Sequence, residues 1–277
     1  MNKLKAISAQ QPLMFTLLLV ITCICALYST LLVSEWLLNF FGTDESDLVT
    51  SDIISSTFKN IISLSLIILI VKFNWKEETL LTTPYRNWHS NWLLVSLPMM
   101  LIAALNLTSI EWQILDVTLF RATGWLYTNI STGIFEEVLL RGICFYVLYT
   151  AWKDQKNGLI KAAIWQAFIF GLAHYVNLTK APFIEVSIQV AYSTLIGIGF
   201  AGLVAYTRSL WPAIAIHSLI NAVGSINAFF DPNFVQPQMS PASYVVVIVI
   251  IALICALPGY ILLKKRIAHI ADDQAIA

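Results

Sequence analysis

Residues 122–150 read ATGWLYTNISTGIFEEVLLRGICFYVLYT, a mostly apolar stretch whose only charged residues are Glu136, Glu137 and Arg141. A charged side chain at the centre of a bilayer costs between about 2.5 and more than 10 kcal/mol, so such residues are rare and are usually paired or functional. The three charges therefore mark a candidate site inside a membrane span.

The composition of the whole chain indicates an integral membrane protein. Of its 277 residues, 58% are hydrophobic and only 12% are charged, and the mean hydropathy is +0.76. A helix that crosses the hydrocarbon needs about 17 to 25 mostly apolar residues. We predict an all-α, polytopic bundle of about eight transmembrane helices that forms a single domain over residues 1–277. The predicted spans are 13–38, 53–73, 91–108, 122–150, 161–180, 186–207, 210–230 and 243–263.

The distribution of basic residues predicts the orientation. When the connections between spans are assigned alternately to two sides, most of the 16 Lys and Arg residues fall on one side. Only Lys59, Arg121 and Lys180 fall on the other. Cytoplasmic loops carry the excess of Lys and Arg, so we predict that both termini are cytoplasmic and that the first span is an uncleaved helix. We expect a multi-pass protein of the plasma membrane, or of the inner membrane in a bacterium, that contacts lipid and no nucleic acid.

Glu136, Glu137 and Arg141 cannot all have the same role. On a helix Glu137 and Arg141 are four residues apart in the favourable acid-first order, so they can neutralise each other. Glu136 then projects about 100° away around the helix. A buried carboxylate without a partner can exchange protons near neutral pH, as a general base acting on water must do. The alternative is an ion pair that only fixes helix packing, which leaves Glu136 unexplained.

Two histidines follow in later apolar segments. His174 comes after Gly171 and Ala173, small residues that allow helices to approach closely. His217 and Asn221 are four residues apart and share one helix face. Two donors aimed at one point form the type of site that stabilises an oxyanion. For each histidine, the alternative is a hydrogen bond that only joins two helices.

The predicted spans also give the depth of these residues in the membrane. Glu136 and Asn221 are expected near the bilayer centre, His217 about one turn toward the cytoplasm, and His174 toward the other face. Helix tilt or shifted span boundaries are needed to bring these side chains together.

Several familiar catalytic motifs are missing from the sequence. It contains no H-E-x-x-H of a zinc protease and no G-x-S-x-G of a serine hydrolase. Gly197, Gly199 and Gly202 form G-x-G-x-x-G, but this pattern lies within an apolar helix and has no strand before it. We interpret it as a helix packing face and not as a nucleotide site.

The remaining motifs resemble those of a known family, the CAAX-type prenyl endopeptidases and their bacterial relatives, called the CPBP or Abi family. Three family patterns occur here in the family order. They are E-E-x-x-x-R at Glu136, Glu137 and Arg141, F-x-x-x-H at Phe170 and His174, and H-x-x-x-N at His217 and Asn221. The resemblance covers a catalytic core of about residues 130–225, and the plan of eight helices is also similar.

The resemblance implies an intramembrane endopeptidase that hydrolyses a peptide bond of a membrane-associated protein or peptide, which is lipidated in the prenyl-protease members. Glu136 and His174 would position and deprotonate a water molecule. His217 and Asn221 would hold the oxyanion. Glu137 and Arg141 would orient the site.

The cofactor and two other classes of function stay open at this point. Glu136, His174 and His217 could together bind zinc. One glutamate acting on water, with an amide and an imidazole as donors, needs no metal, and we favour this mechanism. The other classes are a non-catalytic immunity or binding protein that uses the same polar cavity, and a transporter with an intramembrane acid for proton coupling.

Overall fold

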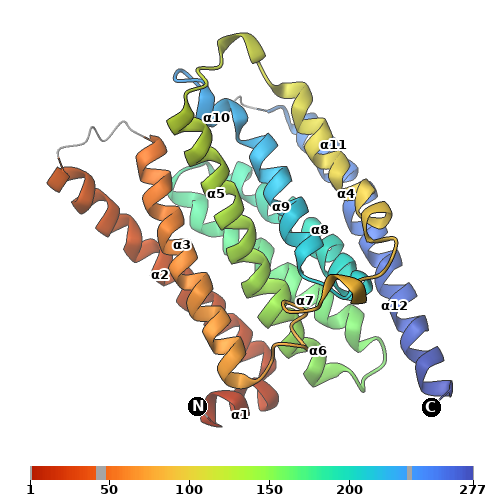
Figure 1. Ribbon diagram of the computed structural model, residues 1–277. Helices are drawn as coiled ribbons and strands as arrows, with labels where there is room; N and C mark the ends of the chain where they lie inside the picture. Colours follow the sequence, from red (N-terminus) through yellow and green to blue (C-terminus); the bar gives the residue numbers. More distant parts are fainter. Residues whose placement is uncertain (1, 42–47, 236–238, 277) are drawn as a thin grey trace.

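Figure 1 shows a bundle of long helices in the computed structural model, which describes residues 2–41, 48–235 and 239–276. These residues contain no strand, so the predicted all-α class is confirmed. Within the same ranges, 6 helical segments are long and apolar enough to cross a membrane. They are Pro12–Ser34, Val49–Phe73, Trp92–Ser109, Gly158–Thr179, Phe183–Thr207 and Pro241–Ala271.

The two other predicted spans, 122–150 and 210–230, are also helical but are not among these six. The first contains the three charges of the candidate site, and the second is divided at Ser225. Both run through the middle of the bundle in the view of Figure 1. The first consists of α5 (Leu119–Glu137), η4 (Val138–Phe145) and α6 (Tyr146–Trp152), and the second of α9 (Trp211–Gly224) and α10 (Ile226–Phe230).

The remaining helices surround these two. The long ones are α2 (Pro12–Phe41), α3 (Leu48–Phe73), α4 (Trp92–Asn106), α7 (Gly158–Ala173), α8 (Phe183–Thr207), α11 (Pro241–Ile251) and α12 (Leu257–Ile276). The short ones are α1 (Asn2–Gln10), η1 (Tyr85–Asn87), η2 (Leu107–Ser109), η3 (Trp112–Ile114), η5 (His174–Thr179) and η6 (Ala252–Ala256).

Glycines allow the central helices to approach closely. The three glycines of G-x-G-x-x-G pack as the sequence predicted: Gly197 lies against Ala167 of α7, and Gly199 and Gly202 lie against Gly259 of α12. A side chain at any of these glycines would collide with the neighbouring helix. Close contact of this kind is typical of helix pairs in membranes.

The helical rod that carries the charges has a wide turn immediately after Glu137. This segment, η4, is a π-helix of 8 residues, and all of them are buried. Segments of this type are rare and occur often at functional sites. It contains Arg141, so the irregular turn lies within the charged motif.

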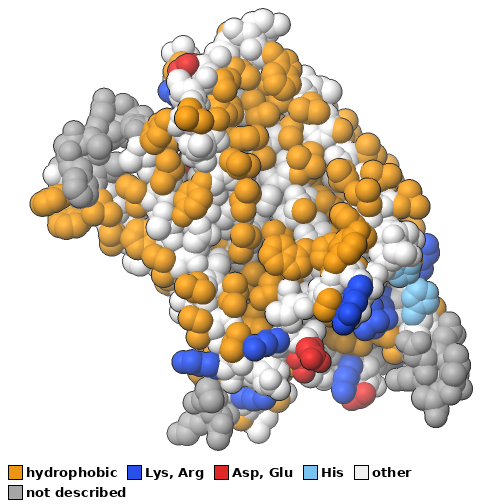
Figure 2. Space-filling model, in the orientation of Figure 1, with side chains coloured by type: hydrophobic (Ala, Val, Ile, Leu, Met, Phe, Trp, Pro, Cys, Tyr) orange, Lys and Arg blue, Asp and Glu red, His pale blue; other side chains and the backbone are white. Residues whose placement is uncertain are grey.

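Lys and Arg side chains gather at one end of the bundle, below a broad hydrophobic band (Figure 2). Both chain termini lie at this same end (Figure 1). We call it the basic end; Lys72 at the end of α3, Arg208 at the end of α8 and Lys264 of α12 belong to it. Lys59 differs from the prediction: it was expected in a connection between spans, but it lies inside α3, within the span Val49–Phe73.

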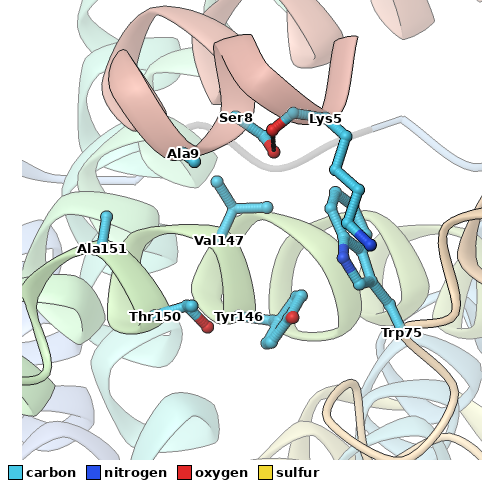
Figure 3. A pocket seen from close by; sticks show the side chains of 8 residues that line it. All are labelled: Lys5, Ser8, Ala9, Trp75, Tyr146, Val147, Thr150 and Ala151. Atoms are coloured by element: carbon cyan, nitrogen blue, oxygen red, sulfur yellow. Dashed lines mark hydrogen bonds between the residues drawn. The ribbon is translucent and has the colours of Figure 1, made fainter. Parts of the chain in front are cut away.

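The short helix α1 packs against α6 at the basic end. Between them lies a pocket of about 240 Å³, and Figure 3 shows Lys5 and Ser8 of α1 on one side of it and Tyr146 and Val147 of α6 on the other. Lys5 Nζ donates a hydrogen bond to the carbonyl oxygen of Phe73 at 3.0 Å. This bond ties α1 to the end of α3.

Candidate active site

Glu137 and Arg141 form a buried ion pair across one turn of the central rod. Arg141 Nη1 donates to Glu137 Oε1 at 2.8 Å, and both side chains are 0% exposed. The guanidinium also lies against two aromatic rings, 4.7 Å from the centroid of Phe170 and 5.3 Å from that of Phe200. Aromatic faces stabilise a desolvated cation. Arg141 is thus held by α7 and α8 as well as by its own helix.

The same Glu137 oxygen also contacts His217 of α9. His217 Nδ1 lies 2.7 Å from Glu137 Oε1. Because a carboxylate oxygen accepts, Nδ1 carries the proton and donates it. The other ring nitrogen, Nε2, faces Glu136 Oε2 at 3.5 Å. Glu137 therefore fixes the orientation of the imidazole, as a carboxylate partner of histidine commonly does.

The two neighbouring glutamates have different surroundings. The side chain of Glu137 is fully buried, whereas that of Glu136 is 23% exposed. Glu136 has no arginine partner of its own in the ranges that the structure describes. Glu137 therefore holds both Arg141 and His217, whereas Glu136 is only partly buried.

His174 begins η5 at the end of α7. Its Nδ1 donates to the carbonyl oxygen of Phe170 at 2.9 Å, which leaves Nε2 as the acceptor nitrogen of the neutral ring. Ser193 Oγ lies 3.5 Å from Nε2, at the outer limit of a hydrogen bond.

Phe170 contacts both histidines of the site. Its ring contacts that of His174 edge-on at a centroid distance of 4.8 Å and that of His217 at 6.3 Å. It also contacts Arg141. In the sequence Phe170 is only a motif position, and the structure gives it a packing role at the junction of three site residues.

Asn221 lies farther from the basic end than the span boundaries predicted. His217 is level with Glu136, since Nε2 lies 3.5 Å from Oε2. Farther from the basic end on the same two helices, Ser225 accepts a hydrogen bond from Asn129 at 3.1 Å. Asn221 is therefore about one turn away from Glu136 along the bundle, and not at the same depth. Its side chain has no hydrogen-bond partner within the described residues.

Lys59 is a charged residue beside the site that the sequence analysis did not single out. Its Nζ donates to Thr132 Oγ1 at 3.0 Å, one turn before Glu136 on α5. The ammonium group interacts electrostatically with the Glu136 carboxylate. The signal was available in the sequence, because a lysine within a predicted span is as costly as the charges of α5 and therefore as informative.

A polar strip continues from Lys59 between α3 and α5, away from the basic end. Asn60 Nδ2 donates to Ser131 Oγ at 2.9 Å, and Ser56 Oγ donates to Thr128 Oγ1 at 3.2 Å. Hydroxyl and amide groups thus line one contact between two membrane helices, and this contact extends from the region of Glu136 toward the end opposite the basic end.

The candidate zinc ligands are Glu136, His174 and His217. Across residues 2–41, 48–235 and 239–276, no group of three or more His, Cys, Asp and Glu side chains is arranged to hold a metal ion. Glu136 approaches His217 at 3.5 Å, whereas the His174 ring contacts Phe170 and Ser193.

The segment that carries this geometry is similar to a known protein family. No curated protein and no solved structure matches the chain. The family model described as Rce1-like, type II CAAX prenyl endopeptidase Rce1-like, matches residues 118–223. This segment runs from the start of α5 almost to the end of α9 and contains all of the predicted site residues. The match confirms, for residues 118–223, the resemblance to the CAAX protease family that the three motifs indicated.

Proposed function

We propose that this protein is an intramembrane endopeptidase that hydrolyses a peptide bond of a membrane-associated protein or peptide. The observation that carries the proposal is that the imidazole of His217 lies between two carboxylates, those of Glu137 and Glu136. A buried carboxylate holds one side of an imidazole, and the other side faces a second, partly exposed carboxylate. The family match over residues 118–223 supports peptide hydrolysis as the class of reaction.

Glu136 is the general base in this mechanism. Its partial exposure leaves space for a water molecule, from which the carboxylate takes a proton as the water oxygen attacks the carbonyl carbon. A positioned base contributes about 10²- to 10⁴-fold to the rate. His174 positions the same water through Nε2, since Nδ1 is committed to the Phe170 carbonyl.

His217 and Asn221 stabilise the charge that develops on the carbonyl oxygen. In its imidazolium form, His217 is held by Glu137 through Nδ1 and donates from Nε2. The amide of Asn221 lies one turn away on the same helix and supplies the second donor. Removing one donor of this type commonly lowers kcat by about 10²- to 10³-fold. The proton taken by Glu136 then passes to the leaving amine, which completes hydrolysis.

In this proposal the basic end faces the cytoplasm, and both termini are cytoplasmic. The support is the concentration of Lys and Arg at the end of the bundle where the two termini lie (Figures 1 and 2). Membrane lipid surrounds the broad hydrophobic band above it.

Cleavage of a panel of membrane-associated peptides by the purified protein tests the function. Wild type should cut at least one peptide, and Glu136→Gln, which keeps the shape of the side chain, should lower kcat by about 10²- to 10⁴-fold. Glu185→Gln, in the first turn of α8, is the matched control and should retain activity. A chelator should leave the wild-type rate unchanged.

Other outcomes would support other functions. Activity that a chelator removes and zinc restores would indicate a zinc protease with Glu136, His174 and His217 as ligands. A cellular phenotype that survives Glu136→Gln would contradict catalysis and favour a non-catalytic binding or immunity protein.

A further inference from the structure

The face of α5 that carries Glu136 is polar over the two turns before it. Thr128, Thr132 and Glu136 follow one another at intervals of four residues, so they share one helix face. All three are partly exposed. Ile130, which is 42% exposed, points about 120° away from Glu136 around the helix. The face of Glu136 is therefore distinct from the exposed apolar face of α5.

A polar face of α3 meets these residues, since α3 and α5 lie side by side (Figure 1). Asp52, Ser56 and Lys59 are spaced by four and three residues and also share one helix face. Ser56 Oγ donates to Thr128 Oγ1 at 3.2 Å, and Lys59 Nζ donates to Thr132 Oγ1 at 3.0 Å. We call these five residues the polar seam.

Charged groups continue the polar seam to the end of the bundle where α3 begins and η5 ends, which we call the opposite end. Lys59 interacts electrostatically with both Glu136 and Asp52. Asp52 interacts in turn with Lys180, which immediately follows η5 and is exposed. Charges of alternating sign thus extend from Glu136 to the surface at the opposite end.

Toward the basic end, the same region is apolar and buried. Leu66 and Ile70, which continue the face of Lys59, are 5% and 1% exposed. Leu140, one turn beyond Glu136, is 3% exposed, and the three apolar side chains belong to one cluster. The pocket beside α1 and a second cavity of about 170 Å³ at the ends of α8 and α12 do not have Glu136 among their lining residues. An apolar core therefore separates Glu136 from the basic end.

We infer that water and the scissile segment of the substrate reach Glu136 from the opposite end, along the polar seam. A peptide backbone carries polar groups that are costly to bury without partners, so it follows hydrogen-bonding side chains and does not cross the apolar core. The inference rests on the proposed function and narrows its substrate class. The bond that is cut lies toward the membrane face at the opposite end, which is extracytoplasmic in the orientation proposed above.

Cysteine labelling in proteoliposomes tests the side of access without any substrate. A membrane-impermeant maleimide, which reacts with hydrated thiolates, is added outside intact vesicles that hold the full-length Thr128→Cys or Thr132→Cys protein. Thr179→Cys at the end of η5 and Lys265→Cys on α12 report the two sides, since both positions are exposed. We expect the two seam variants to be labelled in the same fraction of molecules as Thr179→Cys. The chain without an added cysteine gives the background from its four native thiols.

Two matched variants control for reaction through the core or through lipid. Ser63→Cys continues the face of Lys59 by one turn toward the basic end, where Ser63 is buried. Ile130→Cys lies on the exposed apolar face of α5. Both should react at least about tenfold more slowly than Thr132→Cys, because a thiol away from water does not ionise. Thermal unfolding of each variant verifies that it is folded.

The labelling pattern decides between the two ends. Labelling of the seam variants in the same fraction of molecules as Lys265→Cys would overturn the inference, and so would reaction of both no faster than that of Ile130→Cys. Neither result bears on whether the protein cuts peptides, which the Glu136→Gln assay decides separately. With a cleaved peptide, a bulky maleimide attached at Thr128→Cys from the opposite end should block cleavage. Unchanged cleavage after complete labelling would show that the substrate enters elsewhere.

Discussion

The inner and outer halves of the candidate site are built differently. In the inner half, contacts of 2.7 and 2.8 Å join Glu137 to His217 and Arg141, and none of the three side chains is more than 8% exposed. In the outer half, Glu136 is 23% exposed, and its contact with His217 is 3.5 Å long. The inner half is closely packed and buried, whereas the outer half is looser and partly exposed.

Two consecutive residues can serve these different halves because of helix geometry. Successive side chains on a helix point about 100° apart. Glu137 therefore turns toward the packed centre, where α7, α8 and α9 supply Phe170, Phe200 and His217. Glu136 approaches His217 at the other ring nitrogen, and its carboxylate also interacts electrostatically with Lys59 of α3.

The largest expected effect comes from breaking the inner half. Arg141→Met leaves the Glu137 carboxylate buried without its cation, and loss of one member of a buried pair costs about 3–5 kcal/mol. Thermal unfolding in detergent should show a large decrease in stability. Glu136→Gln, in the outer half, should change stability by no more than about 0.5 kcal/mol.

A double variant checks the cause of this loss. Glu137→Gln combined with Arg141→Met removes both charges and should be clearly more stable than Arg141→Met alone. Equal stability of the two variants would show that packing of the arginine, and not its charge, supports the inner half.

A smaller effect is expected from moving the two central helices apart. A Cβ at Gly133 would collide with the hydroxyl of Ser218 and approach the backbone of Ile214 on α9. Gly133→Ala should therefore lower the free energy of unfolding by about 1–3 kcal/mol, as measured in the same unfolding assay. Gly142→Ala is the matched control, because the nearest atom to its Cβ would be 3.6 Å away. Similar effects of both changes would mean that helix propensity, and not the α5–α9 contact, decides the outcome.

Lys59 offers a way to test the outer half. Lys59→Met removes the cation that interacts electrostatically with Glu136, and the contribution of a partly exposed charge pair is about 1 kcal/mol, or about fivefold in kcat. Kinetics with a cleaved peptide measure this change, and Lys59→Arg should restore most of the rate. A defect that Lys59→Arg does not restore would contradict a role based on charge.

The smallest effect is expected at the contact between His174 and Ser193. Its length of 3.5 Å is at the limit of a hydrogen bond, so Ser193→Ala should lower kcat by no more than about threefold. Ser187→Ala, on the same helix, serves as the control. A loss of more than tenfold would show that Ser193, and not the Phe170 carbonyl, orients the imidazole.

Local geometry explains which features of the site could be predicted from the sequence. The pairing of Glu137 with Arg141 follows from a spacing of four residues on one helix. The contact of His217 with the same oxygen joins residues 80 positions apart and depends on how α9 packs on α5. That register is set by contacts such as Gly133 with Ser218, which no local pattern contains. For the same reason, the predicted depth of Asn221 was wrong by about one turn.

Membrane spans were predictable because apolar length is a property of composition. The all-helical bundle and the six apolar spans follow from it, whereas the collection of basic residues at one end follows from the placement of Lys and Arg between the spans. Lys59 was misplaced because the count of basic residues treated it as part of a connection, although the predicted span 53–73 already included it.

Because of the π-helix η4, the side chains before and after it on the central rod point in directions that a continuous α-helix would not give. A π turn holds more residues than an α turn, so the face of α6 is rotated relative to that of α5. Upstream of this turn, α5 packs against α3 and α9; downstream, α6 packs against α1, α2 and α7. Losing or gaining one residue between Val138 and Phe145 would turn one half of the rod against its neighbours while the other half kept its partners.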